Sequence, residues 1–166
     1  MKPLKGPLET TPLEIPRFMT GEVAKILDVP IWRLQKFLDS PSYPLDASRR
    51  LGKARGSPRQ FSLEDVYRIG IAAFLIRDGF APKIVSGVLK VIENRDLIDV
   101  DEHGDVVLGG ILLRRGKKRP EVDFFRSGKP PEIKAGGSLY YVLDFGDVIP
   151  EIDRRIATVI GKKQRR

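Results

Sequence analysis

The sequence predicts an α+β protein in which four short helices and a long basic loop precede a small β-rich region that ends in a helix. Three patterns support this class. Apolar residues recur at helical spacing between residues 17 and 95, short apolar runs alternate with glycine and proline from 96 to 145, and a helical apolar stripe returns at 149–160. The change of pattern predicts a boundary near residue 95.

The first two helices are predicted to be short and to be joined by a tight turn. Thr20 is a favourable N-cap for a helix whose apolar face begins at Val23. Asp28 and Val29 interrupt this helix, and Pro30 suits the first turn of the next one.

In the second helix, Leu34, Phe37 and Leu38 lie on one side and are predicted to enter the core. The residues left for solvent or for a nucleic-acid groove are Trp32, Arg33, Gln35 and Lys36. Arg, Lys and Gln side chains can donate to base edges and phosphates. For Trp32, general burial tendencies favour a core or partly buried position over a ligand contact.

Two further helices complete the first half. Ser62 is the expected N-cap of the third, with Glu64 and Asp65 in the first turn, where carboxylates favour the helix dipole. Gly79 is expected to end this helix and Pro82 to open the fourth.

In the second half, residues 98–100 and 106–108 are predicted to pair as a hairpin. Further strands are expected at 111–113, 122–125 and 139–145, followed by a helix over 149–160 that Gly161 terminates. The predicted organisation comprises an extended or disordered arm (1–16), a helical domain (17–95), a β-rich dimerisation or regulatory region (96–161) and a basic tail (162–166).

Positive charge is concentrated in the loop before the third helix. The chain has 166 residues and a formal charge of +8, which favours polyanionic partners. The loop carries five cations and no acid: Arg49, Arg50, Lys53, Arg55 and Arg59. We expect phosphate contacts here rather than a merely solvated loop. For a second basic run, Arg114–Arg119, a solvated hairpin and a nucleic-acid contact are equally compatible with the sequence.

The sequence predicts no catalytic site, metal or cofactor. The chain contains no cysteine and one histidine, His103, which is best explained as a surface turn residue. Its acidic pairs fit a helix start and a turn, and its glycines match no phosphate-binding motif. The N-terminal segment does not resemble a signal peptide, and no apolar run is long enough to span a membrane, so we expect a cytoplasmic protein without a membrane partner.

Three blocks of sequence resemble the MerR-type winged helix-turn-helix regulators. The blocks are 20–29, 59–66 and 78–81, and the resemblance covers about residues 17–93. It implies that the helix from Pro30 to about Leu38 enters the major groove, that the loop from Arg49 to Arg59 forms a wing along the backbone, and that the third helix region braces phosphates. The family's long dimerising helix has no counterpart after residue 95.

The function expected from the sequence is transcriptional regulation in a bacterial-type cell through sequence-specific binding of double-stranded DNA. An excisionase-like or antitoxin-like accessory protein and an RNA- or ribosome-associated interaction protein are the alternatives. The C-terminal region is expected to serve homodimerisation or regulation. A small-molecule effector pocket among Phe124, Tyr140 and Tyr141 is compatible with this function, although core packing of these aromatic residues is the favoured interpretation.

Overall fold

A computed structural model describes residues 17–43, 45, 49–51, 57–93, 98–100, 106–114, 121–126 and 140–163. These residues form five helices and two small antiparallel sheets, which confirms the predicted α+β class. The helices are α1 (Thr20–Leu27), α2 (Ile31–Leu38), α3 (Leu63–Arg77), α4 (Pro82–Glu93) and α5 (Phe145–Lys163).

The first sheet lies beside α1 and has three very short strands in the order β1 (Phe18–Met19), β3 (Arg59–Phe61), β2 (Arg49–Arg50). Phe18 pairs with Phe61, and both side chains are buried, so the sheet is anchored in the core. The sequence did not predict β1 or β2 as strands, because two residues are too few to show an alternating pattern.

The second sheet is built around one long central strand, β5 (Val106–Arg114). It pairs with β4 (Ile98–Val100), β6 (Glu121–Arg126) and β7 (Tyr140–Asp144). The predicted hairpin of 98–100 with 106–108 is confirmed. The separation of 106–108 from 111–113 is wrong, because Gly109 and Gly110 continue the strand.

Gly110 allows the strand to continue because its neighbours occupy the space that a side chain would need. A Cβ at this position would lie 2.3 Å from Phe125 Cζ and 2.6 Å from the backbone oxygen of Leu143. The Phe125 ring on the paired strand β6 therefore covers Gly110. Glycine usually weakens a strand, but here its missing side chain makes room for the ring.

The ends of the helices agree with the predictions in part. Ser62 caps α3 reciprocally with Asp65, and Gly79 follows α3 with a left-handed φ of 87°. Thr20, however, is the first residue of α1 rather than its cap. Met19 is the cap, and its N–H donates to the Glu22 carboxylate at 2.8 Å. Pro30 likewise lies one residue before its helix, at the N-cap of α2.

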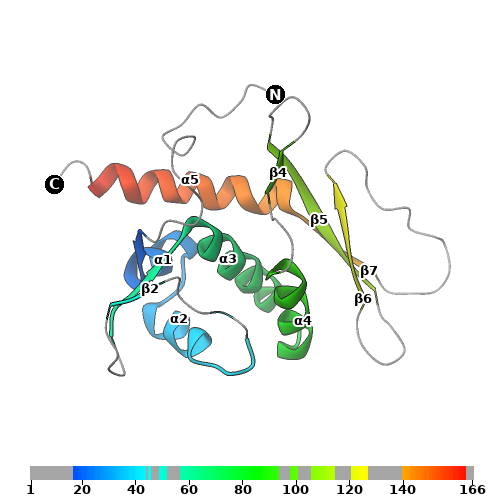
Figure 1. Ribbon diagram of the computed structural model, residues 1–166, viewed down its shortest axis with the longest axis horizontal. Helices are drawn as coiled ribbons and strands as arrows, with labels where there is room; N and C mark the ends of the chain where they lie inside the picture. Colours follow the sequence, from blue (N-terminus) through cyan, green and yellow to red (C-terminus); the bar gives the residue numbers. More distant parts are fainter. Residues whose placement is uncertain are drawn as a thin grey trace.

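Helix α5 is longer than the predicted 149–160. It begins at Phe145, directly after β7, and it continues through Gly161 to Lys163. The predicted strand 139–145 is correspondingly shorter, and the first two residues of the expected basic tail are helical. Figure 1 shows α5 lying along α1 and α3, with the larger sheet at the α4 end of the molecule.

The two halves of the chain share one hydrophobic core. Residues of α1 and α3 such as Ile26 and Ile69 belong to the same buried cluster as Ile111 of β5 and Ile152 of α5. At Gly70 of α3 a Cβ would lie 2.5 Å from Ile152 Cδ1, so the missing side chain allows the two helices to approach closely. Residues from both sides of the predicted boundary near residue 95 thus contribute to the same buried cluster.

Candidate functional site

A tight turn positions α2 against α1. Asp28 adopts a left-handed conformation (φ 55°, ψ 47°), and its N–H donates to Lys25 O at 3.3 Å. Pro30 then takes an extended conformation, and its carbonyl accepts from the N–H groups of Arg33 and Leu34 at 3.0 and 3.1 Å. The two short helices are therefore joined by only three residues with their own backbone hydrogen bonds.

Helix α2 has a buried side and an exposed side. Leu34 and Leu38 are buried, and Phe37 is half-buried against the ring of Tyr43 at a centroid distance of 4.3 Å. The predicted core face of this helix is confirmed. The four residues that the helical phase leaves outside the core, Trp32, Arg33, Gln35 and Lys36, are exposed, and so is Ile31 at the start of the helix.

Trp32 is 63% exposed, so the tendency of a lone tryptophan to be buried gives the wrong expectation. The helical period explains the exposure, because a residue two positions before the buried Leu34 points away from the core. Ile31 beside it is 48% exposed, and the two side chains form an apolar surface at the start of α2.

The two cations of α2 are exposed on the surface of the helix. Within the described residues, neither Arg33 nor Lys36 has a hydrogen-bond or ion-pair partner. The two residues are three positions apart and share one flank of the helix, while Trp32 and Gln35 share the other. One helix face therefore combines two cations, an amide and an indole.

The basic loop is partly described, and it includes a short antiparallel hairpin. The backbone of β2 pairs with β3, with Arg49 opposite Gln60 and Arg50 opposite Arg59, and the Leu51 N–H donates to Pro58 O at 2.9 Å. Lys53 and Arg55 lie outside the described residues. The backbone of Arg49 and Arg50 therefore belongs to a strand that begins four positions after the buried Leu45.

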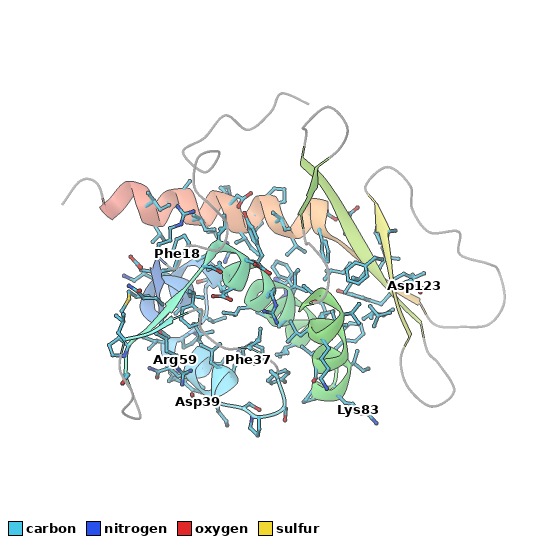
Figure 2. All side chains as sticks on the ribbon, viewed as in Figure 1. Phe18, Phe37, Asp39, Arg59, Lys83 and Asp123 are labelled. Atoms are coloured by element: carbon cyan, nitrogen blue, oxygen red, sulfur yellow. The ribbon has the colours of Figure 1, made fainter. Side chains whose placement is uncertain are left out.

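Arg59 is the loop cation whose side chain the structure describes, and this side chain already has an acidic partner. Its guanidinium forms an ion pair with Asp39, the residue that ends α2. The Arg59 side chain is only 18% exposed, whereas Asp39 is 60% exposed. Figure 2 shows the two side chains meeting between α2 and β3. The pair joins the hairpin to α2, and no sequence pattern indicated this contact.

The aromatic residues of the C-terminal strands pack onto the helices. Tyr141 meets Phe80 edge to face at 4.5 Å, and its hydroxyl donates to Asp78 at the end of α3. Burial, which has the larger effect, and this hydrogen bond together raise the pKa of Tyr141 to about 12. Phe124 also packs on the core, and the Tyr140 side chain lies outside the described residues. The Tyr141 contacts agree with the favoured core interpretation rather than with an effector pocket at these residues.

A cavity of about 630 Å³ lies elsewhere, between α2, α3 and α5. Its apolar wall includes Leu34 and Phe37 of α2, Ala73 and Phe74 of α3, and Ile152 of α5. Two acidic and four basic side chains also line it: Asp28, Glu151, Arg33, Lys36, Arg77 and Arg155. Sequence reasoning missed this cavity, since its walls come from three separate parts of the chain.

Glu151 is held as an anion by its neighbours on α5. Its carboxylate accepts two hydrogen bonds from Arg154, at 2.9 and 3.0 Å, and one from Arg155 at 2.7 Å. These hydrogen bonds lower the pKa of Glu151 to about 2, and those from Arg154 have the largest effect. Arg155 also donates to Ile26 O at 3.4 Å, which links α5 to α1.

Comparison with protein-family models finds no match, and comparison with curated proteins finds no significant match. Among the described residues, none of the helices combines the length and the apolar character needed to cross a membrane. The same residues contain no cluster of three or more His, Cys, Asp or Glu side chains suited to a metal ion.

Proposed function

We propose that the chain is a sequence-specific duplex DNA-binding protein that acts as a transcriptional regulator through a winged helix-turn-helix of MerR-like type. In this proposal α2 enters the major groove, and the hairpin of β2 and β3 is the wing. The larger sheet and α5 form the regulatory part of the same protein.

The exposed face of α2 is the observation that carries the proposal. A helix with Leu34 and Leu38 in the core and Trp32, Arg33, Gln35 and Lys36 outward offers donors for base edges and phosphates. A merely solvated helix face would not require an indole that is 63% exposed. The apolar surface of Ile31 and Trp32 suits packing on sugars or on a thymine methyl group.

The hairpin supports the same interpretation. The Arg59–Asp39 ion pair sets β3, and with it the paired strand β2, next to the end of the proposed reading helix. In this arrangement Arg49, Arg50, Lys53 and Arg55 are the proposed phosphate contacts, while Arg59 positions the wing. The overall charge of +8 favours approach to DNA.

Selection of bound sequences from random duplex DNA, followed by fluorescence anisotropy at several salt concentrations, tests the proposal. The logarithm of the binding constant is expected to fall with the logarithm of salt with a slope of about −0.9 for each phosphate contacted. A flat salt response contradicts the proposal. Tighter binding of a single-stranded or folded RNA than of the selected duplex would favour the RNA-associated alternative.

A paired substitution separates base recognition from general charge. Replacing Arg33 and Lys36 together by alanine is expected to weaken binding to the selected sequence more than binding to random DNA. The matched control replaces Lys83 and Lys90 of α4, which removes the same charge away from α2. Equal losses from both double variants would mean that α2 does not read bases.

A further inference from the structure

The cavity between α2, α3 and α5 combines an apolar wall with cations that are shared with the proposed DNA-binding face. Its volume of about 630 Å³ falls within the range of small-molecule sites, about 300 to 1,000 Å³. Leu34, Phe37, Ala73, Phe74 and Ile152 supply surface for a hydrocarbon or aromatic body. Ser40 and Tyr43 add hydroxyl groups at the end of α2.

The charged side chains around the cavity favour an occupant with a negative charge. Of the two acidic residues that line it, Glu151 is bound by Arg154 and Arg155. Arg77 lies over the Phe74 ring at 4.3 Å and 3.6 Å from an Asp78 oxygen, so it also has partners. Arg33 and Lys36, which have no partner within the described residues, remain as the cations that an incoming anion can recruit.

We propose that this cavity is an effector site for a small organic anion with an apolar body, such as an aryl or alkyl carboxylate or sulfonate, held by Arg33 and Lys36. The body lies against α3 and α5, and the anionic group lies toward α2. The regulatory part of the inference rests on the proposed function, because the same two cations are assigned to DNA.

Occupancy of the cavity opposes DNA binding in this arrangement. An anion paired with Arg33 and Lys36 engages the donors that would otherwise meet base edges and phosphates, and it adds negative charge beside the reading helix. By linkage, DNA must lower the affinity for the anion by the same factor as the anion lowers the affinity for DNA.

Titration of the full chain with 8-anilinonaphthalene-1-sulfonate, followed by its fluorescence, tests the site directly. N-phenyl-1-naphthylamine is the matched probe, since it keeps the aromatic body and lacks the sulfonate. We expect saturable one-to-one binding of the sulfonate and binding of the neutral probe weaker by about tenfold or more, the value of one good charge-assisted contact. Equal affinities, or sulfonate binding without saturation, would overturn the proposal.

Two pairs of variants locate the bound probe. Ala73→Phe fills the cavity and is expected to reduce sulfonate affinity by about tenfold or more, whereas Ala157→Phe adds the same side chain at an exposed position of α5 outside the cavity lining. Lys36→Gln is expected to reduce sulfonate affinity by about fivefold to tenfold, whereas Lys83→Gln on α4 is expected to leave the affinity unchanged. Lys36 is exposed, so this variant remains informative if Ala73→Phe does not fold. Sulfonate affinity that neither Ala73→Phe nor Lys36→Gln changes would contradict the site.

Competition between the two ligands separates this inference from the proposed function. We expect the sulfonate to weaken binding of the selected duplex and the duplex to weaken sulfonate binding equally, with sodium sulfate at matched ionic strength having a smaller effect. Specific sulfonate binding by a chain that binds no duplex would overturn the DNA proposal and retain the site. Specific binding of both ligands without competition would overturn the shared role of Arg33 and Lys36.

Discussion

The guanidinium of Arg59 donates a hydrogen bond to the carboxylate of Asp39, so an ion pair joins strand β3 to the end of α2. Asp39 is more than half exposed, and exposed ion pairs contribute little to stability, about 0 to 1 kcal/mol. The consequence of the pair is therefore geometric. It fixes the side of α2 from which the hairpin extends.

Replacing Asp39 by asparagine is expected to release Arg59 and to reduce the preference for the selected DNA sequence. Binding to random duplex is expected to increase, because a carboxylate is removed and a cation is freed beside the proposed interface. Fluorescence anisotropy with the selected and random duplexes measures the ratio. Asp147→Asn removes an exposed carboxylate of α5 and serves as the control. An unchanged ratio in Asp39→Asn would show that the pair does not position the wing.

The hydrogen bond between Tyr67 and Asp153 is expected to stabilise the contact of α3 with α5. The buried Tyr67 hydroxyl donates to Asp153 Oδ1 at 2.5 Å, and burial raises the pKa of the Asp153 carboxyl. Tyr67→Phe leaves a half-buried carboxylate without this donor and is expected to lower the free energy of unfolding by about 1 to 3 kcal/mol. Urea unfolding measures the change.

Asp153→Asn keeps an acceptor for Tyr67 and removes the charge that burial disfavours, so its cost at neutral pH is expected to be smaller than that of Tyr67→Phe. Because the pKa of Asp153 is higher in the folded protein, the folded state holds this proton more tightly than the unfolded chain. The contribution to stability is then present below about pH 4, the ordinary pKa of an aspartate, and is lost as the pH rises through the folded pKa. Asp153→Asn should lack this loss, and an identical pH profile would refute the assignment.

Gly110→Ala is expected to destabilise the larger sheet, because a methyl group at this position collides with the Phe125 ring and with a backbone oxygen. Overpacking of this kind costs about 1 to 3 kcal/mol. Gly87→Ala is the matched substitution, since a Cβ at Gly87 of α4 meets nothing within 4 Å. It is expected to stabilise the protein by up to about 1 kcal/mol through helix propensity. Thermal unfolding of the two variants should therefore move in opposite directions.

The carboxyl of Glu151 is expected to titrate near pH 2 in the folded protein, as its pKa indicates. Arg154→Gln removes two of its three hydrogen bonds and is expected to raise the midpoint toward the ordinary value of a glutamate. Since the pKa is lowered by folding, the stabilising contribution is present above about pH 4 and is lost as the pH falls toward 2. NMR of the carboxyl carbon gives the midpoint, with Lys83→Gln as a control that should not change it.

The local features of this fold were largely predictable. The spacing of Leu34 and Leu38 predicted the buried side of α2, and with it the exposed positions of Arg33, Gln35 and Lys36. Ser62 and Gly79 predicted the two ends of α3. The Ser62 side chain accepts from a first-turn N–H group, and Gly79 adopts the left-handed conformation that follows the helix. The hairpin of β4 with β5 followed from alternation over a short separation.

Contacts between distant parts of the chain were not predictable. Asp39 and Arg59 are twenty residues apart, and their types suit solvent equally well. The cavity requires α5 to lie against α3. This close approach depends on Gly70, because a Cβ at that position would collide with Ile152. Trp32 shows a different limit, because the general burial tendency of tryptophan predicts a core position, whereas the phase of α2 places this residue outward.

Helix α5 also determines the order in which this protein can complete its folding during synthesis. Ile26 and Ile69 share their core with Ile152 and Ile156, which leave the ribosome more than eighty residues after Ile69 does. Until α5 arrives, the surfaces of α1 and α3 that it covers remain open to water and to other chains. The nascent chain therefore depends on α5 to cover α1 and α3, and pausing of translation between these helices would favour aggregation.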